Sequence, residues 1–324
     1  MPAVRESTRR LDRRYTKNQM PNQAYYVKIE TKSLIEYAAY VANREFDSDT
    51  KLLKHLHFLQ TGGRWVFRGQ KDINWKLEPT FQRRTRKLEE APTRIGSIVE
   101  TEKYVIEQFR RRAHQYNPYL GHLSSLEWLA LMQHHGAPTR LLDWTRSAWV
   151  GAFFAAADAD PQEDSAIWVI DARWLKEKAV TLIRDRRPEL KDISEDTDLG
   201  APDSFDRMFF ASSHELDSVI APVEPFTMDE RLTAQQGFFL CSTTLSWPFE
   251  MTLKHMLEAQ PEEQLVIQRL VIKPEARLGL LRQLHGMNIN YGTLFPGLDG
   301  FARSLSNVAE LHASSHAADP SDLL

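Results

Sequence analysis

Residues 124–145 read SSLEWLALMQHHGAPTRLLDWT, and the capping and terminating residues of this stretch predict both ends of a helix. Ser124 and Glu127 have the spacing of a capping box, in which each side chain binds the backbone N–H of the other residue. Gly136 supplies the expected C-terminal stop, and Pro138 prevents the helix from continuing. The apolar face is supplied by Leu126, Leu129, Ala130 and Met132. We therefore expect a helix over residues 124–135 with a tight turn after it.

The polar residues that end this stretch indicate a site. His134 and His135 lie in the last helical turn, but adjacent helical side chains point about 100° apart, which disfavours a shared metal ion. Arg140 and Asp143 flank two leucines, so an ion pair between them at the rim of the core is one interpretation. The other is a structural helix–loop–helix joint, with Asp143 or Thr145 capping the next helix.

The stretch Trp65-Val-Phe-Arg-Gly-Gln70, upstream of this helix, predicts a short strand that ends in an arginine. The guanidinium of Arg68 suits a phosphate or a carboxylate, because its planar N–H groups can bind two oxygens at once. Gly69 lets a ligand or another backbone approach closely. The alternative is a structural arginine that binds an internal carboxylate beside a glycine turn.

Hydrophobic periodicity and turn residues predict the remaining elements. Expected strands cover residues 25–29, 166–170, 237–242 and 265–272, and expected helices cover 33–43, 97–116, 147–158, 249–258, 275–285 and 297–311. We expect Cys241 to be a buried strand residue, and Phe295 and Leu298 to pack inside. Strands and helices alternate without the regular rhythm of a doubly wound sheet. The expected class is α+β, a modest mixed sheet wrapped by helices.

Composition narrows the class of protein. The 324 residues carry a formal net charge of −3 and are 42% hydrophobic, which supports a real core and excludes a chain-wide basic field for nucleic acid. The single cysteine excludes internal disulfides and cysteine-type zinc sites. Residues 1–18 are basic without an apolar signal region, and the sequence has no membrane-spanning run. We therefore expect a cytoplasmic protein that does not contact membranes.

The pattern along the chain predicts one main domain. Residues 1–24 are polar and basic and are expected to be flexible, as is the tail over residues 312–324. Between them, residues 25–311 form the expected single domain. A charge-rich run near residues 184–206 indicates an exposed insertion.

Taken together, three motifs resemble the FRG domain family, named for Phe-Arg-Gly. They are Trp65-Val-Phe-Arg-Gly-Gln70, Trp75-x-Leu77-x-Pro79 with Arg83, and Gln133-His-His-Gly-x-Pro-Thr-Arg-Leu-Leu-Asp-Trp-Thr145. Ala234-Gln-Gln-Gly-Phe238 and Leu294-Phe-Pro-Gly-Leu-Asp-Gly300 extend the resemblance, which covers residues 26–305. The family occurs mainly in bacteria and phages, which implies a toxin or phage-defence role.

An arginine and a glycine at the end of an early strand also resemble the first motif of arginine-type ADP-ribosyltransferases, in which this arginine holds the phosphates of NAD. That resemblance implies a split sheet and NAD as cosubstrate. Ser242-Thr243-Thr244 would stand for the second motif of that family, and Glu262 or Glu263 for its catalytic glutamate. The chain departs from the family's usual glutamate pair, and the motif at residues 133–145 has no counterpart there.

These resemblances imply an NAD-dependent ADP-ribosyltransferase or NAD glycohydrolase without a metal. The expected catalytic residues are Arg68, His135, Arg140, Asp143 and Glu263, and the expected NAD-binding residues are Arg68, Gly69, Gln70, Gln236 and Ser242. A nucleic acid or a protein is the expected partner. Two alternatives stay open: a nucleotide- or nucleic-acid-binding module without chemistry, and a nuclease that uses His134 or His135 for acid–base catalysis.

Overall fold

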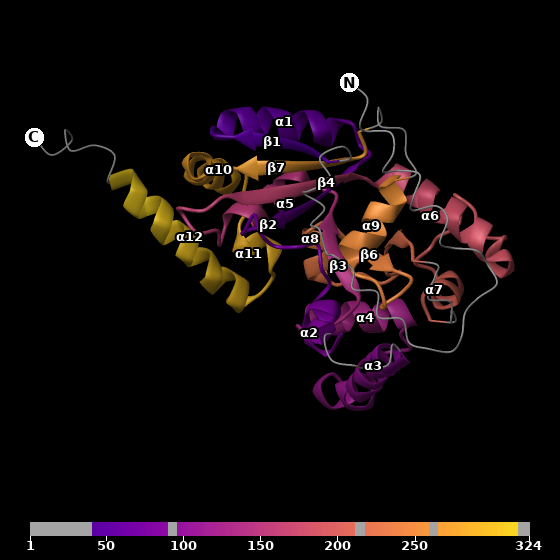
Figure 1. The fold of residues 1–324 in the computed structure, drawn as a ribbon. Coiled ribbons are helices and arrows are strands. Elements are labelled where there is room, and N and C mark those ends of the chain that lie inside the picture. Colours follow the sequence, from indigo (N-terminus) through magenta and orange to yellow (C-terminus); the bar gives the residue numbers. More distant parts are fainter. Residues whose placement is uncertain (1–40, 90–95, 211–217, 259–264, 317–324) are drawn as a thin grey trace, which may run out of the picture. The chain divides into compact units, whose positions relative to one another are not determined.

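The computed structural model describes residues 41–89, 96–210, 218–258 and 265–316, which belong to one compact unit of the chain (Figure 1). The strands are β1 (Ala42–Phe46), β2 (Trp65–Gln70), β3 (Leu141–Thr145), β4 (Ser165–Asp171), β5 (Ile220–Val223), β6 (Gly237–Ser242) and β7 (Ile267–Ile272). The helices are α1 (Asp49–Thr61), α2 (Thr80–Glu89), α3 (Gly96–Tyr116), α4 (Ser125–His134), α5 (Ala148–Ala156), α6 (Ala172–Arg186), the 3-10 turn η2 (Pro188–Leu190), α7 (Pro202–Phe209), α8 (Glu230–Ala234), α9 (Phe249–Glu258), α10 (Pro274–Gly286), α11 (Tyr291–Leu294) and α12 (Leu298–His316).

The described strands form one mixed sheet in the order β1-β7-β4-β2-β3-β6-β5. Only β1 and β7 run parallel, and the other neighbours are antiparallel. β2 pairs with β4 along its whole length but meets β3 through a single residue pair, Phe67 with Thr145. Beyond that pair the two strands separate, so the sheet has a fork at its centre.

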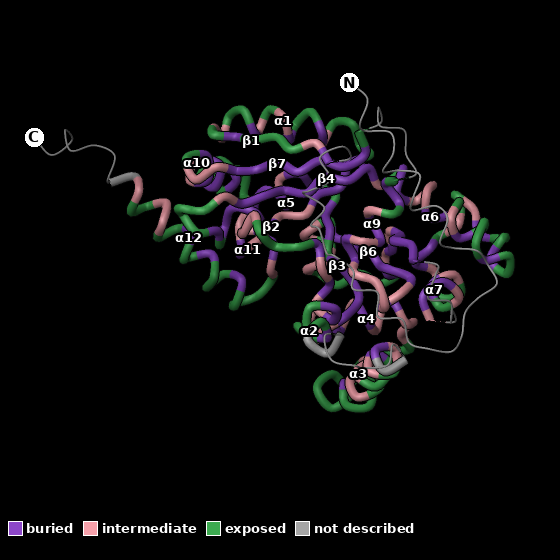
Figure 2. The backbone as a smooth tube through the Cα atoms, viewed as in Figure 1, coloured by how far each residue is buried: buried purple, intermediate pink, exposed green. Residues whose placement is uncertain are grey.

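Helices cover both faces of the sheet, which explains why every residue of β4 is buried. Ile167 and Val169 of β4 pack on one face with apolar residues of α1, α5, α10 and α11. Trp168 and Ile170 pack on the other face with residues of α4, α6, α7 and α9. Figure 2 shows the central strands buried, whereas α1 and α12 carry exposed residues along their outer surfaces. The expected α+β class, a mixed sheet wrapped by helices, is confirmed.

Many helices and strands lie where the local sequence signals predicted them. The Ser124–Glu127 capping box begins α4, Gly136 has a φ of +77° at its exit, and Cys241 is fully buried in β6. The expected helices at residues 97–116, 147–158, 249–258, 275–285 and 297–311 correspond to α3, α5, α9, α10 and α12, and the expected strands at 166–170, 237–242 and 265–272 to β4, β6 and β7.

Other expectations were wrong. The helix expected over residues 33–43 is contradicted at its end, because Ala42–Phe46 is β1, held by parallel pairing with β7. Residues 141–145 form β3 rather than part of a helix–loop–helix joint, and Ser147 caps α5 in place of Asp143 or Thr145. Leu298 is 79% exposed rather than packed inside. The strand expected at residues 25–29 and the rest of the helix at 33–43 lie outside the described residues.

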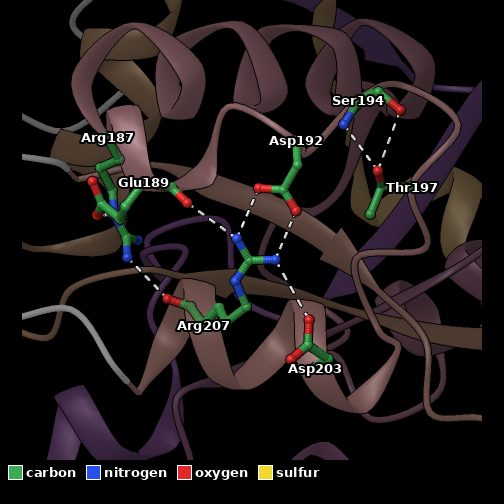
Figure 3. A network of polar contacts seen from close by, with 7 residues as sticks. All are labelled: Arg187, Glu189, Asp192, Ser194, Thr197, Asp203 and Arg207. Carbon is green, nitrogen blue, oxygen red and sulfur yellow. Dashed lines mark hydrogen bonds and ion pairs between the residues drawn. The ribbon is translucent and has the colours of Figure 1, made fainter.

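The charge-rich region is packed more tightly than an exposed insertion. Leu190 and Ile193, which belong to this region, are buried in the hydrophobic core. Arg207 binds both carboxylate oxygens of Asp192, each at 2.8 Å, and Arg187 donates to the carbonyl of Arg207 (Figure 3). Arg187 also donates to the carbonyl of Met208 at 3.0 Å. This network ties the loop after α6 to α7.

Candidate functional site

The side chain of Arg68 connects β2 to β3 at the fork, where the backbone pairing of the two strands stops. Arg68 lies one residue beyond the last pair, and its Nη1 donates to the carbonyl oxygen of Asp143 at 2.7 Å. The same nitrogen lies 4.0 Å from the Asp143 carboxylate. Gln133 Nε2 donates to that carboxylate at 2.9 Å from α4. The guanidinium and the carboxylate are therefore held side by side at the mouth of the fork.

Phe67 and Gly69 face away from this pair, toward α5. Phe67 is fully buried. A Cβ on Gly69 would overlap the Gly151 carbonyl oxygen and the Ala155 amide nitrogen, and it would lie 2.7 Å from the carbonyl carbon of Phe154. Gly151 is equally confined, because a Cβ there would lie 2.7 Å from Phe67 Cβ. Gly69 therefore admits the backbone of α5, the second of the two options that the sequence left open.

A pocket of about 350 Å³ opens at the fork, and we call it the fork pocket. Its volume lies at the lower end of the range of ligand-binding clefts. The fork lets residues from both faces of the sheet line one cavity. The lining comprises Phe67, Arg68, Gly69, Lys71, Trp75, Asp143, Trp144, Thr145, Phe154, Asp158, Arg231, Gln235, Tyr291, Phe295 and Arg303.

Cations and aromatic rings alternate along the wall of the fork pocket. The Arg231 guanidinium lies 4.4 Å from the ring centre of Phe295, and the Arg303 guanidinium lies 3.9 Å from that of Tyr291. Lys71 Nζ lies 5.7 Å from the centre of the Trp75 ring, which is 43% exposed. Four cationic and two acidic side chains line the pocket, so its lining carries net positive charge.

Electrostatics in the fork pocket follow from burial. Burial lowers the pKa of the Arg68 guanidinium, the Asp143 carboxylate opposes this shift, and Arg83 adds to it. Arg68 Nε is buried without a hydrogen-bond partner among the described residues. Burial, together with a hydrogen bond to Asp158, raises the pKa of Tyr291, so this phenol stays neutral and donates. Asp158 also binds Arg303.

A smaller pocket of about 160 Å³ adjoins the fork pocket, and we call it the side pocket. Asp143, Arg231 and Gln235 line both and form the boundary between them. His134 lines the side pocket, and its Nδ1 lies 3.0 Å from an oxygen of Asp229. The full lining comprises Thr80, Ala130, Gln133, His134, Gly136, Ala137, Asp143, Asp229, Arg231, Leu232, Gln235 and Phe239.

Comparison with known protein families identifies the segment that builds the fork. Residues 63–164 match the FRG domain. This segment is an FRG domain. No curated protein and no solved structure matches the chain.

The FRG domain supplies only part of the fork pocket. Its matched residues contain Arg68, Trp75, Asp143 and Phe154, together with α5. Arg231, Gln235, Tyr291, Phe295 and Arg303 lie after the match and complete the lining. Residues outside the matched FRG segment therefore supply two of the four cations and two of the aromatic rings that line the fork pocket.

The structure brings together three of the residues expected at the site. Arg68, Gly69 and Asp143 of the FRG domain line the fork pocket. Gln70 does not, because it is 2% exposed, accepts from Trp168 Nε1 and donates to the Lys76 carbonyl. Ser242 is also buried, and its hydroxyl accepts from the Thr244 amide. Glu262 and Glu263 lie outside the described residues.

Two expected site residues lie one position away from a residue that lines a pocket. Gln236 is exposed with a φ of +47°, whereas Gln235 lines both pockets and donates to the Leu294 carbonyl at 3.0 Å. His135 is exposed and lines neither pocket, whereas His134 lines the side pocket. The sequence predicted the correct residue type at both places, a glutamine and a histidine. Only the fold shows which of the two neighbouring residues lines a pocket.

Arg140 does not pair with Asp143, so that sequence interpretation was wrong. Arg140 is 3% exposed and binds both carboxylate oxygens of Glu102 on α3, with Nε to Oε1 at 2.7 Å. Its Nη1 donates to the Phe209 carbonyl at 2.9 Å. The ion pair joins the start of β3 to α3 within the FRG segment, and the hydrogen bond to Phe209 reaches α7. Arg140 lines neither pocket, whereas Asp143 faces Arg68.

Sequence reasoning missed Arg231, Tyr291 and Arg303, which nothing in the local pattern distinguishes from surface or core residues. Trp75 and Phe295 belong to motifs that carried the family resemblance, and that was their only signal. Within the described ranges, no group of three or more His, Cys, Asp or Glu side chains is arranged to hold a metal ion. None of the helices in those ranges combines the length and apolar character that crossing a bilayer requires.

Proposed function

We propose that this FRG-domain protein binds NAD in the fork pocket and cleaves its nicotinamide–ribose bond, passing ADP-ribose to water or to an acceptor. The observation that carries the proposal is the Arg68–Asp143 pair at the mouth of the fork, beside an aromatic and cationic wall. The resemblance to ADP-ribosyltransferases points the same way.

Binding would use two kinds of contact. The exposed ring of Trp75 offers a face on which a base can stack, a contact that contributes about 1–3 kcal/mol in nucleic-acid complexes. Arg68, Arg231 and Arg303 offer N–H groups to the pyrophosphate. The side chain of Arg68 is 21% exposed and is oriented by the Asp143 carbonyl, so little ordering is needed when a phosphate arrives.

Cleavage would use Asp143. As the bond from ribose C1′ to nicotinamide breaks, positive charge develops on the ribose, and a nearby carboxylate stabilises it. The Asp143 side chain is 60% exposed and lines both pockets, so its carboxylate is accessible to a bound ligand. The ADP-ribosyltransferase resemblance assigned this role to Glu262 or Glu263.

Calorimetric titration with NAD tests the binding half. Arg68→Ala should weaken NAD binding about 10- to 100-fold, because a hydrogen bond to a charged group contributes about 1.5–3 kcal/mol. Arg173→Ala on α6 is the matched control, since that exposed arginine pairs with Glu177 and lines neither pocket. Unchanged affinity of a folded Arg68→Ala protein would contradict the proposal.

Release of nicotinamide tests the chemical half. Asp143→Asn keeps an oxygen that can accept from Gln133 but removes the negative charge, so release should fall while NAD still binds. Tight NAD binding by the natural sequence without nicotinamide release would favour the second candidate, a nucleotide-binding module. That candidate is supported by the absence of glutamate from the described lining of the fork pocket.

The cellular role is part of the same proposal. An enzyme that consumes NAD would act as a bacterial toxin or a phage-defence effector, as the family resemblance implies. Expression in bacteria should then deplete NAD and stop growth, whereas Arg68→Ala should do neither. Growth arrest that persists in Arg68→Ala would contradict a role for the fork pocket in toxicity.

A further inference from the structure

The side pocket contains a histidine–carboxylate pair that the binding of NAD leaves unused. His134 Nδ1 lies 3.0 Å from Asp229 Oδ2, and both residues line this pocket. In the neutral ring, an Nδ1–H that donates to the carboxylate leaves the lone pair on Nε2. Such a ring accepts a proton at Nε2.

The pair is held between two helices. His134 ends α4, and Asp229 caps α8 by accepting from the Leu232 amide through Oδ1 at 2.7 Å. Arg231 Nη1 donates to the His134 carbonyl at 3.5 Å. The charged and titratable groups around the ring are Asp229 and Arg231 from the α8 side, His135 at 4.8 Å between ring centres, and Asp143 from β3. Asp229 thus uses one oxygen to cap and the other to orient His134.

We propose that the side pocket receives the nucleophile, a water molecule or an acceptor hydroxyl, and that His134 is its general base with Asp229 as a positioning residue. The inference rests on the proposed function, because it needs a ligand in the fork pocket to attack. The two pockets meet at Asp143, so a nucleophile beside His134 approaches the ribose across the same boundary.

The oxygen of the nucleophile forms a bond to C1′ of the ribose while the C1′–N bond breaks, and nicotinamide leaves with the bonding electron pair. The proton of the nucleophile moves to Nε2 of His134. The Asp229 carboxylate stabilises the resulting imidazolium, and the proton then passes to solvent. With water the products are ADP-ribose, nicotinamide and a proton.

The experiment measures NAD affinity and the rate of nicotinamide release for the same set of variants. His134→Ala should lower kcat about 100-fold or more, as for other general bases, while NAD affinity stays unchanged. Free imidazole should restore part of that rate. His285→Ala is the matched control, because His285 also lies in the last turn of a helix, α10, but lines neither pocket.

Asp229→Asn tests the positioning role, because asparagine keeps the oxygen that caps α8 and removes the charge beside His134. It should lower kcat without changing NAD affinity or the melting temperature. Adding Asp229→Asn to His134→Ala should cause no further loss, since residues that act as a unit are not additive. A purely structural ion pair predicts the opposite: lower melting temperatures with an unchanged kcat.

Each outcome separates the two proposals. A protein that binds no NAD overturns both. One that binds NAD without releasing nicotinamide overturns the assignment of His134 and leaves the binding proposal standing. Release at the natural rate by His134→Ala, or an independent loss in the double variant, overturns this inference alone.

Discussion

Gly69 lies where β2 packs closely against α5. The backbone atoms of Gly151, Phe154 and Ala155 surround the position that a β-carbon would take. Tight crossings of this kind are costly to overfill, because strand and helix must move apart together. At Arg68, one position earlier, the side chain turns the other way and reaches the fork pocket. Alternation along β2 thus separates a residue that packs against α5 from one whose side chain faces the fork pocket.

Gly69→Ala should lower the free energy of unfolding by about 3 kcal/mol or more, since the added methyl group overlaps backbone rather than a flexible side chain. Gly121→Ala is the control, because a Cβ there meets no atom within 4 Å. Denaturant midpoints of the two variants provide the measurement. Equal midpoints would show that α5 adjusts to the added methyl group.

Arg140 and Glu102 allow a second test at the residue scale. Removing one member of a buried ion pair costs about 3–5 kcal/mol, whereas replacing both with apolar residues is often close to neutral. Glu102→Leu should therefore destabilise the protein strongly, and the double variant Glu102→Leu, Arg140→Met should recover much of the loss. Denaturant unfolding gives both values. A stable double variant that has lost nicotinamide release would return Arg140 to the catalytic residues.

Among the elements, the segment between α6 and α7 depends on the polar network in Figure 3. Pairing with Arg207 holds the pKa of Asp192 at about 2, below its ordinary value of 3.8. Because the folded pKa is the lower one, the contribution to stability is complete above about pH 4 and is lost as the pH falls toward 2. Leu190 and Ile193 lie in the same segment, so this pairing supports their burial.

A carbon-13 titration of aspartate carboxyl groups should find the pKa of Asp192 near 2, with the fold intact. Arg207→Gln should move the pKa of Asp192 back toward 3.8, because hydrogen bonding to the Arg207 guanidinium is the main cause of the lowered pKa. Arg173→Gln, on an exposed pair in α6, should leave it unchanged. A pKa of Asp192 near 3.8 in the natural sequence would mean that the pairing in Figure 3 does not persist in solution.

For the molecule as a whole, the fork pocket joins parts of the chain that are far apart in sequence. β2, β3, the segment around α8 and the end formed by α11 and α12 all contribute to its lining. A ligand present at 100 times its dissociation constant stabilises the folded state by about 2.7 kcal/mol. Because the ligand would contact every one of these segments, its effect should appear in all of them at once.

Hydrogen exchange with saturating NAD should therefore slow in residues 67–71, 143–145, 231–235 and 291–303 together. At a lower NAD concentration, equal to the dissociation constant of the natural protein, Arg68→Ala should show little slowing, because its binding is about 10- to 100-fold weaker. Protection confined to α3 and α4 would place the ligand instead in the groove lined by Lys103, Arg110 and Trp128.

The sequence by itself determined the elements whose ends carry local signals. The capping box and Gly136 define α4, and hydrophobic periodicity located the helices expected at residues 97–116 and 147–158, which are α3 and α5. The motifs at residues 65–70 and 133–145 also identified the FRG domain and two of the charged residues at the fork, Arg68 and Asp143. These features depend on neighbours within a few residues, which periodicity and turn chemistry describe well.

Only the tertiary structure decided the rest. β1 and β3 are strands because of partners more than ninety positions away, β7 and β6, and local pattern holds no record of such pairing. The partner of Arg140 is Glu102 rather than the nearby Asp143, and Arg231 and Arg303 reach the fork pocket from segments that follow the FRG domain. Burial and pairing across the fold determine what these arginines do, because the partners of a charged side chain can come from segments that are distant in sequence.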